Sequence, residues 1–275
     1  RNEVLAACGA GAAFALTLRS GLSIAGCSSG PESAAPSRSG VRIRRKSPAR
    51  SPHGGFAPMT VAELKASLVH SDRQGLLLDI DETLSATNVA WFKKLEVLFG
   101  NPEGEPIHEL IAKYGLAQNV PFWQTEEAFA WMQRQRDAPE AQDKLPLIPG
   151  AVQGVATLAK VTTVVGYCTV RPSSVNENTI AWLRENGFPE LPVVAKPAEV
   201  PFSEGNQWKA AALHRLWPNV TGIVDDNPKL PKFAGKDYPG KIFLFSHSTC
   251  GPDYDHAIPC RTWDEVLAAA LIHLD

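Results

Sequence analysis

Apolar residues follow two alternating spacings from residue 60 to the end of the chain. Short apolar runs predict buried strands at residues 76–78, 161–168, 192–195, 220–224 and 241–246. Apolar residues at helical spacing predict helices between these runs, at residues 60–70, 151–160, 174–186, 207–216 and 262–273. Strands that alternate with helices form parallel sheets with right-handed crossovers. The sequence therefore predicts an α/β fold with a doubly wound, parallel, five-stranded, Rossmann-like sheet.

The connection between the first two predicted strands is unusually long and helical. Roughly sixty residues pass there, with apolar residues at helical spacing in Val89–Phe99, Ile107–Tyr114 and Glu126–Arg136. Prolines separate these three patterns. Thr60 and Glu63 form a capping box that marks the start of the first helix, so we expect folded structure from about that point.

Polar residues with candidate chemistry stand where three of the predicted strands end. They are Asp79 and Asp81 after the first strand, Thr169 after the second, and Asp225 and Asp226 after the fourth. In parallel sheets such ends meet at one edge, which is where ligands bind. The first two aspartates are two positions apart and could therefore point the same way. A bound divalent cation would relieve their repulsion, and solvated acids in a turn are the alternative.

These features, taken in chain order, resemble the motifs of the haloacid-dehalogenase-like (HAD) superfamily in its phosphatase form. The motifs are Asp79-x-Asp81-x-Thr83, Thr169, Lys209 and Asp225-Asp226-Asn227-Pro228. Each lies at the end of an apolar strand or at the start of a helix, across residues 76–228. One such motif is weak evidence, whereas four in the family's order form a specific resemblance.

The resemblance implies a division into a core and a cap. The core comprises residues 59–87 and 148–275, and residues 88–147 form a small helical cap inserted after the first strand. We expect most aromatic residues of this insertion to build the cap's own core. Trp91, near the catalytic loop, is the one we expect to face the substrate.

The resemblance also implies roles for the acidic residues. Asp79 is the nucleophile that forms an aspartyl-phosphate, and Asp81 is the general acid and base. Mg²⁺ is held by the Asp79 side chain, the Asp81 backbone carbonyl and Asp226. Asp225 supports Asp226 without binding the metal directly. The order of the last two acids stays open, as does a role for Asn227, because Asp-Asp-Asn-Pro is also a good turn sequence.

The remaining candidate site residues are those that meet the phosphate. Thr169 offers a hydroxyl to it, and Thr83 and Val170 belong to the same substrate-binding set. Lys209 offsets the charge of the nucleophile and the phosphate, with Lys196 as its rival for that role. Arg171 is either a substrate clamp, because its planar fork matches phosphate, or a surface ion pair.

The function that follows from the resemblance is Mg²⁺-dependent hydrolysis of a small phosphate monoester. A phosphotransferase or mutase differs only in the acceptor, and a non-catalytic module that binds phosphorylated ligands usually lacks a catalytic group. Dehalogenases need no acid such as Asp81. Phosphoprotein phosphatases of the superfamily lack a long cap. The sequence does not indicate which phosphate ester is cleaved or how many subunits assemble.

Composition and charge add few constraints. The formal net charge is -2 and the folded part is acidic on balance, so no nucleic acid is expected as a partner. The five cysteines lack metal-binding spacing, and we expect Cys168 to be a buried thiol. Cys250 and Cys260 could pair, but reduced thiols are favoured. The chain contains no run of eighteen consecutive apolar residues, so no membrane-spanning helix is predicted. We expect a cytoplasmic location.

Residues 1–58 differ in composition from the rest of the chain, being rich in Arg, Ser, Ala and Pro. They could be an organelle-targeting segment, or a lipoprotein signal with Ile24-Ala25-Gly26-Cys27 as the lipid-anchoring box. The third interpretation, which we favour, is upstream sequence translated ahead of a start at Met59. In each case we expect no packed core from these residues.

Overall fold

The computed structural model describes residues 55–251 and 254–274. Its centre is a parallel six-stranded sheet with the order β3-β2-β1-β4-β5-β6. The strands are β1 (Gly75–Leu78), β2 (Val164–Pro172), β3 (Val193–Lys196), β4 (Val220–Asp225), β5 (Lys241–Phe245) and β6 (Ala257–Cys260). The predicted doubly wound α/β fold is therefore confirmed.

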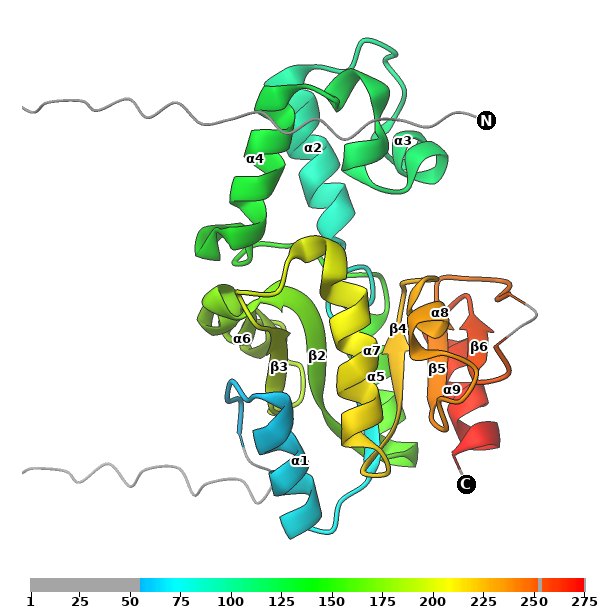
Figure 1. The fold of residues 1–275 in the computed structure, drawn as a ribbon. Helices are drawn as coiled ribbons and strands as arrows, with labels where there is room; N and C mark the ends of the chain where they lie inside the picture. Colours follow the sequence, from blue (N-terminus) through cyan, green and yellow to red (C-terminus); the bar gives the residue numbers. More distant parts are fainter. Residues whose placement is uncertain (1–54, 252–253, 275) are drawn as a thin grey trace, which may run out of the picture. The chain divides into compact units, whose positions relative to one another are not determined.

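Helices cover both faces of the sheet (Figure 1). One face is covered by α1 (Val61–His70), α7 (Gly205–Leu216) and α8 (Leu230–Ala234). The other face is covered by α5 (Ala151–Val161), α6 (Asn176–Glu185) and α9 (Trp263–His273). Each layer buries apolar side chains against the sheet, and this burial is the main force that stabilises such a fold. The expected capping box at Thr60 and Glu63 opens α1.

The strand order places a switch point between β1 and β4. From β1 the chain moves outward to β2 and β3, and it then returns to β4 on the other side before continuing to β5 and β6. In doubly wound sheets the crevice at such a point, beyond the carboxyl ends of the strands, is where ligands bind. The ends of β1 and β4 carry the first and last acidic motifs, so the topology brings these motifs together.

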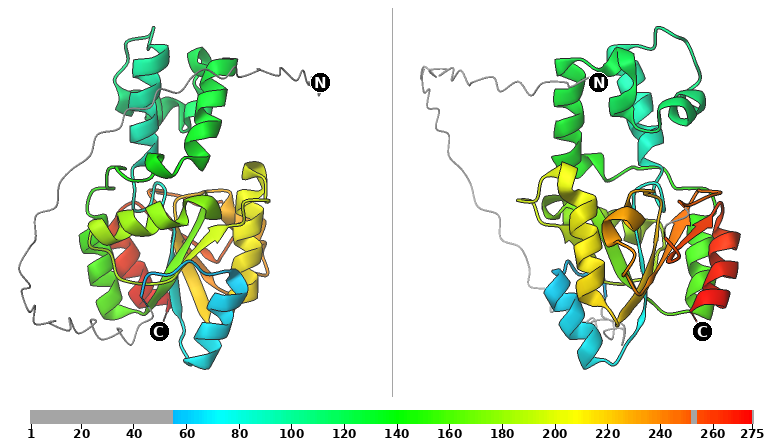
Figure 2. Two further views of the ribbon diagram at one scale, coloured as in Figure 1. Left: turned by 90° about the vertical axis from the view of Figure 1, so that its left-hand side faces the viewer. Right: turned by 45° about the vertical axis from the view of Figure 1, so that its right-hand side comes forward.

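Three helices of the long insertion form a separate helical part above that end of the sheet (Figures 1 and 2). They are α2 (Thr87–Phe99), α3 (Ile107–Tyr114) and α4 (Glu126–Asp137), and we call them the cap. Phe92 and Trp123 are fully buried in its apolar core, as expected for the cap aromatics, and meet edge to face. Phe129, in contrast, is exposed. The Arg136 guanidinium of α4 lies 4.0 Å from the centre of the Phe202 ring, which joins the cap to the core.

The sheet differs from the predicted one in strand number. Its sixth strand, β6, pairs in parallel with β5 at the edge of the sheet. This strand was not predicted, because it is only four residues long and contains Pro259. A proline cannot donate to the ladder and is tolerated at an edge. Five predicted strands are therefore present, and a short edge strand is added.

The second strand and the start of the folded chain also differ from the prediction. β2 begins at Val164 and runs to Pro172, so Thr169 lies inside it, followed by an irregularity in its pairing with β3. Residues 56–58 are packed, contrary to the expectation for residues 1–58: Phe56 stacks on Tyr167, and Pro58 bridges to Val193. The predictions for residues 1–54 lie outside the described residues.

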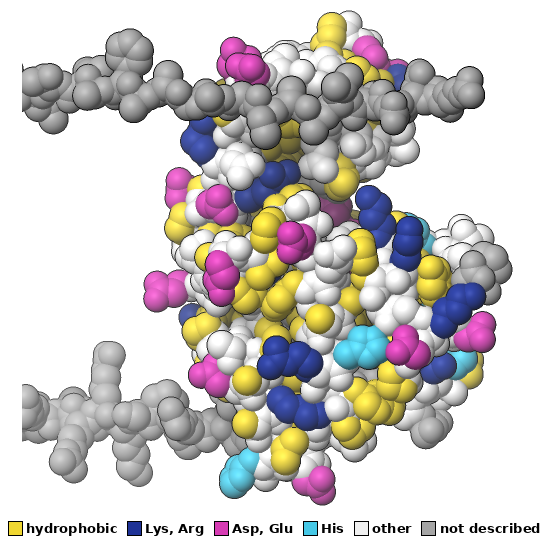
Figure 3. Space-filling view, viewed as in Figure 1, with side chains coloured by type: hydrophobic (Ala, Val, Ile, Leu, Met, Phe, Trp, Pro, Cys, Tyr) yellow, Lys and Arg dark blue, Asp and Glu magenta, His cyan; other side chains and the backbone are white. Residues whose placement is uncertain are grey.

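The described part of the chain contains no helix that is long and apolar enough to cross a membrane. Its cysteines, Cys168, Cys250 and Cys260, are all free thiols. Cys168 is buried, as predicted. Lys and Arg side chains are interspersed with Asp and Glu side chains over the face seen in Figure 3, without a large patch of one sign.

Gly222 in β4 is a position where one added methyl group should destabilise the sheet. A Cβ atom there would lie 2.4 Å from the backbone oxygen of Lys241 on β5, and backbone cannot move aside as a flexible side chain can. We expect Gly222→Ala to lower the free energy of unfolding by about 1–3 kcal/mol, measured by urea denaturation. Gly251→Ala is the matched control, because among the described residues its methyl group would meet only Tyr254, at 3.8 Å. Equal stability of the two variants would contradict this interpretation.

Candidate active site

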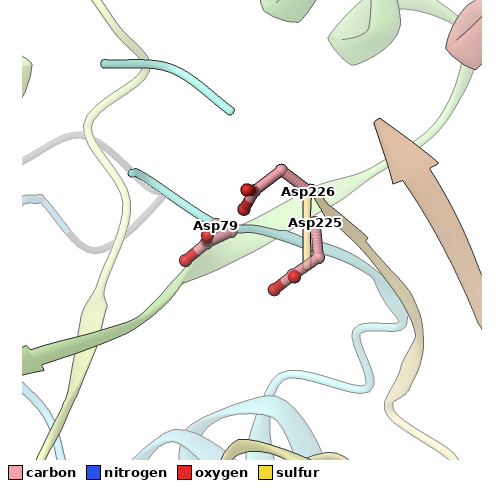
Figure 4. A group of neighbouring side chains, drawn as sticks. All are labelled: Asp79, Asp225 and Asp226. Carbon is pink, nitrogen blue, oxygen red and sulfur yellow. The ribbon is translucent and has the colours of Figure 1, made fainter. Parts of the chain in front are cut away.

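Three carboxylates converge at the carboxyl ends of β1 and β4. Asp79 follows β1 directly, and its amide donates to the Val224 carbonyl of β4 at 2.9 Å, so backbone pairing continues to the site. Asp225 is the last residue of β4, and Asp226 follows it. One oxygen from each of the three acids lies within 4.8 Å of the others. Figure 4 shows the three carboxylates close together, with the last two leaving neighbouring chain positions in different directions.

Lys209 is the cation at the centre of this group. Its Nζ donates to Asp79 Oδ1 at 2.7 Å and to Asp225 Oδ2 at 2.7 Å. It comes from α7, and its side chain is almost completely buried. Burial opposes a charged ammonium, but the Asp225 and Asp79 carboxylates outweigh that effect and raise the pKa of Lys209. The lysine is therefore charged, and it offsets two of the three acids.

Lys196, the rival candidate, lies elsewhere. It ends β3, and its Nζ donates to the carbonyls of Pro197 at 3.1 Å and Val200 at 2.5 Å, in the loop that follows. Its ammonium is therefore engaged by the protein's own backbone. Lys209 is the lysine that meets the Asp79 carboxylate.

The charge balance around Asp79 fits a bound divalent cation. Burial, together with repulsion from Asp225 and Asp81, raises the pKa of Asp79 to about 7 in spite of Lys209. Burial, together with repulsion from Asp225 and Asp79, raises the pKa of Asp226 well above its ordinary value. Buried acids that repel each other to this extent are stabilised as anions by a metal ion. An all-oxygen set of carboxylates suits Mg²⁺.

Asp225 and Asp226 have different surroundings. Asp225 is fully buried, and both of its oxygens accept hydrogen bonds, one from Lys209 Nζ and one from the Asn227 amide at 2.9 Å. The Asn227 side-chain oxygen accepts from the Lys229 amide at 3.0 Å, so it caps a turn. Asp226, beside them, is only partly buried. This arrangement favours Asp226 as a direct metal ligand and Asp225 as support for Lys209.

Asp81, the second acid of the first motif, is paired with Arg171. Arg171 Nε donates to Asp81 Oδ2 at 2.9 Å, and its Nη2 donates to Oδ1 at 2.7 Å. Burial would raise the pKa of Asp81, but the arginine outweighs it and the pKa is lowered. Arg171 is only 5% exposed. The ion pair considered for Arg171 is therefore present, but its arginine is buried and not at the surface, while the Asp81 side chain is 26% exposed.

The loop after Asp81 links the site to the cap. Glu82 has a left-handed backbone (φ 56°), and its carboxylate accepts from the Asn88 amide at 2.6 Å, at the start of α2. Burial raises the pKa of Glu82 to about 7. Thr87, the first residue of α2, donates to Asp81 Oδ1 at 2.5 Å. Thr83 is fully buried, and its hydroxyl has no hydrogen-bond partner within the described protein.

The other predicted site residues are placed as follows. Thr169 is buried, and its oxygen accepts from the Arg171 amide at 3.2 Å, which leaves its own proton to donate. Val170 is half-exposed and lies close to Gly205 at the start of α7. Trp91 packs edge to face on Trp131 within the cap, with ring centroids 6.0 Å apart. Its contact with a substrate stays a prediction.

Sequence reasoning missed the polar residues that surround Asp81. Besides Thr87, these are Ser85, which accepts from Arg171 Nη2 at 3.1 Å, and Thr179, which accepts from Nη1 at 3.3 Å. Ser85 and Thr87 follow the first motif closely, so their position in the loop was a signal. The sequence around Thr179 contained no such signal, because the pattern of a helix does not specify whether a threonine within it is buried or exposed.

A groove lined by Arg73, Lys160 and Glu190 lies at the opposite end of the strands and is not part of this site.

No protein-family model and no curated protein matches the chain. Solved structures resemble it: a putative beta-phosphoglucomutase from Thermotoga maritima shares 17% identity at a TM-score of 0.45, covering 71% of this chain and 97% of that one. A HAD family hydrolase from Deinococcus radiodurans R1, solved with bound phosphate and sodium, shares 13% at 0.43, covering 72% and 95%. Protein Tyrosine Kinase A from Mycobacterium tuberculosis shares 18% at 0.41, covering 72% and 97%.

The names of these structures include the superfamily that the sequence motifs resemble. Identities below 20% and TM-scores below 0.5 are nevertheless too low to assign a family or an activity. A proposal for the activity therefore rests on the residues of the site.

Substitution of the two neighbouring aspartates should separate metal binding from stability. We expect Asp226→Asn to weaken Mg²⁺ binding roughly tenfold or more, because a carboxylate ligand is lost, while the fold stays stable. Asp225→Asn should instead lower the free energy of unfolding by about 1–3 kcal/mol, because it removes a buried charged partner of Lys209. Calorimetric titration and urea denaturation measure the two effects. The reverse pattern would exchange the two roles.

Mg²⁺ binding should tighten as the pH rises. A metal ligand must be deprotonated, and the pKa of Asp79 is raised to about 7, so protons compete with the metal below that pH. The affinity should therefore increase between about pH 5.5 and pH 8 and level off above that range. Calorimetric titration at several pH values measures this change. An affinity independent of pH would contradict the assignment of these acids as metal ligands.

Proposed function

We propose that the chain is a HAD-superfamily phosphatase that hydrolyses a small phosphate monoester, with Mg²⁺ as its cofactor and an aspartyl-phosphate intermediate on Asp79. The observation that carries the proposal is the convergence of three carboxylates with the buried Lys209 at the carboxyl ends of β1 and β4. Three of the four motif elements, which are distant in the sequence, thus share one place. This is the place where a sheet of this topology binds ligands.

The two displacements divide the work between Asp79 and Asp81. In the first, an Asp79 oxygen attacks phosphorus, the bond from phosphorus to the leaving oxygen breaks, and Asp81 gives that oxygen a proton. In the second, water attacks the phosphorus of the aspartyl-phosphate, Asp81 takes a proton from the water, and the bond to Asp79 breaks to release inorganic phosphate. The ion pair with Arg171 matches the ionised form that Asp81 has between these steps.

The residues around Asp79 provide the charge that the reaction needs. Mg²⁺ held by Asp79, Asp226 and the Asp81 carbonyl would supply positive charge to the phosphoryl oxygens. Lys209 adds a fixed cation at 2.7 Å from Asp79 Oδ1, within a buried site where such a charge is weakly screened. Thr169 has a hydroxyl proton left to donate to a phosphoryl oxygen. Together these groups offset the repulsion between an anionic nucleophile and an anionic ester.

Asp79→Asn should abolish turnover and leave the fold intact, because an amide oxygen is a poor nucleophile and the side chain keeps its volume. We expect phosphate release from p-nitrophenyl phosphate to fall by on the order of 1,000-fold or more. Asp264→Asn, at an exposed position in the first turn of α9, is the control and should keep the parent rate. Release by Asp79→Asn at the parent rate would exclude Asp79 as the nucleophile.

A phosphate-release screen tests the proposed function against its alternatives. Sugar phosphates, nucleotides, phospholipid head groups and phosphopeptides are tested with Mg²⁺ and with excess chelator. We expect release from at least one small ester, and loss of that release in chelator. Transfer of the phosphoryl group to an added sugar phosphate, without free phosphate, would identify a phosphotransferase. Binding of a phosphorylated ligand without either reaction would identify a non-catalytic module.

A further inference from the structure

Arg171 has almost all of its hydrogen-bonding capacity committed within the protein. Its Nε and Nη2 donate to the two oxygens of Asp81, and Nη2 also donates to Ser85 at 3.1 Å. Its Nη1 donates to Thr179 on α6 at 3.3 Å. The guanidinium is therefore anchored to two parts of the core, the loop after β1 and α6, and it is buried. A substrate clamp needs donors that point at the ligand, and these donors point elsewhere.

The carboxylate of Asp81 is held by two residues in this arrangement. The arginine fork binds both oxygens, which fixes the plane of the carboxylate and not only its position. Thr87 at the start of the first cap helix also donates to Oδ1, at 2.5 Å. A short acidic side chain held in this way loses its freedom to rotate towards Asp79 or the metal ligands.

We propose that Arg171 is a positioning residue, which acts on the reaction by orienting the Asp81 carboxylate and does not itself bind the substrate. The inference rests on the proposed function, because it concerns the acid and base of that reaction. Proton transfer requires the carboxylate oxygen to lie within hydrogen-bond reach of the oxygen that leaves or attacks. Loss of the arginine fork frees the carboxylate to turn, and a misplacement of about 1 Å costs on the order of 100-fold in rate.

A double-mutant cycle between Arg171 and Asp81 tests this role. The variants are Arg171→Met, Asp81→Asn and the double variant, assayed with p-nitrophenyl phosphate and Mg²⁺. The p-nitrophenolate group leaves without a proton, so the Asp81→Asn variant should keep a measurable rate. We expect Arg171→Met to lower kcat by on the order of 100-fold, with KM unchanged within about twofold. In the Asp81→Asn background the same substitution should lower kcat by no more than about twofold.

Two further variants of Arg171 and one control variant keep the test independent of folding. Arg171→Lys keeps the buried charge but loses the planar fork, so it should fold and should also lose kcat without a change in KM. Arg171→Ala should recover part of its lost rate when guanidinium ion is added at low millimolar concentration, because the free ion can occupy the same position. Arg261→Met removes an arginine from an exposed ion pair with Glu265 and should keep parent kinetics.

The outcomes separate positioning from the other roles. A rise in KM that persists in the Asp81→Asn background would make Arg171 a substrate clamp and overturn the proposal. A fall in melting temperature with parent kcat, or the same loss of kcat with and without the Asp81 carboxylate, would overturn it as well. Parent protein that releases no phosphate from any ester would instead overturn the proposed function, and this inference with it.

Discussion

The buried ion pairs of Lys209 are the interaction on which the rest of this site depends. Two carboxylates from different strands, Asp79 and Asp225, accept from one ammonium at 2.7 Å each. Removal of a charge from water costs several kcal/mol, and such a group persists only where partners compensate it. Lys209 therefore ties α7 to the ends of β1 and β4, at the switch point of the sheet. It compensates two acids and leaves the third, Asp226, available to a metal ion.

A second ion pair, between Arg171 and Asp81, gives the second aspartate of the first motif surroundings that differ from those of the three acids at the candidate metal site. The two aspartates of the first motif are only two residues apart, yet their partners differ: Asp79 meets Lys209, and Asp81 meets Arg171. Burial and the neighbouring carboxylates outweigh Lys209 and raise the pKa of Asp79, whereas Arg171 outweighs burial and lowers the pKa of Asp81. Pairs of acids whose surroundings separate their pKa values are typical of sites where two carboxylates perform different tasks.

The sequence predicted the fold and the acidic cluster well, because both depend on short-range patterns. An apolar run followed by a polar residue marks a strand end, and parallel topology brings such ends together. The predictions were incomplete or wrong at positions where tertiary packing determines the structure. Arg171 could have lain at the surface, since nothing in Thr169-Val170-Arg171 indicates that Asp81 faces it. The edge strand β6 was missed because a four-residue segment with Pro259 lacks a strand signal. Phe56 and Pro58 are packed because the sheet offers them partners, Tyr167 on β2 for the first and Val193 on the edge strand β3 for the second.

The cap and the catalytic loop share hydrogen bonds, which has a consequence for how the site works. The first two residues of α2, Thr87 and Asn88, contact Asp81 and Glu82, at 2.5 Å and 2.6 Å respectively. Any movement of α2 relative to the core therefore changes the contacts of Asp81 and Glu82. In other enzymes, movements of a cap or lid control access to the active site. In this chain the same helix also contacts Asp81, the carboxylate for which we propose proton transfer, so access to the site and orientation of this carboxylate would be coupled through four neighbouring residues and need no longer-range pathway.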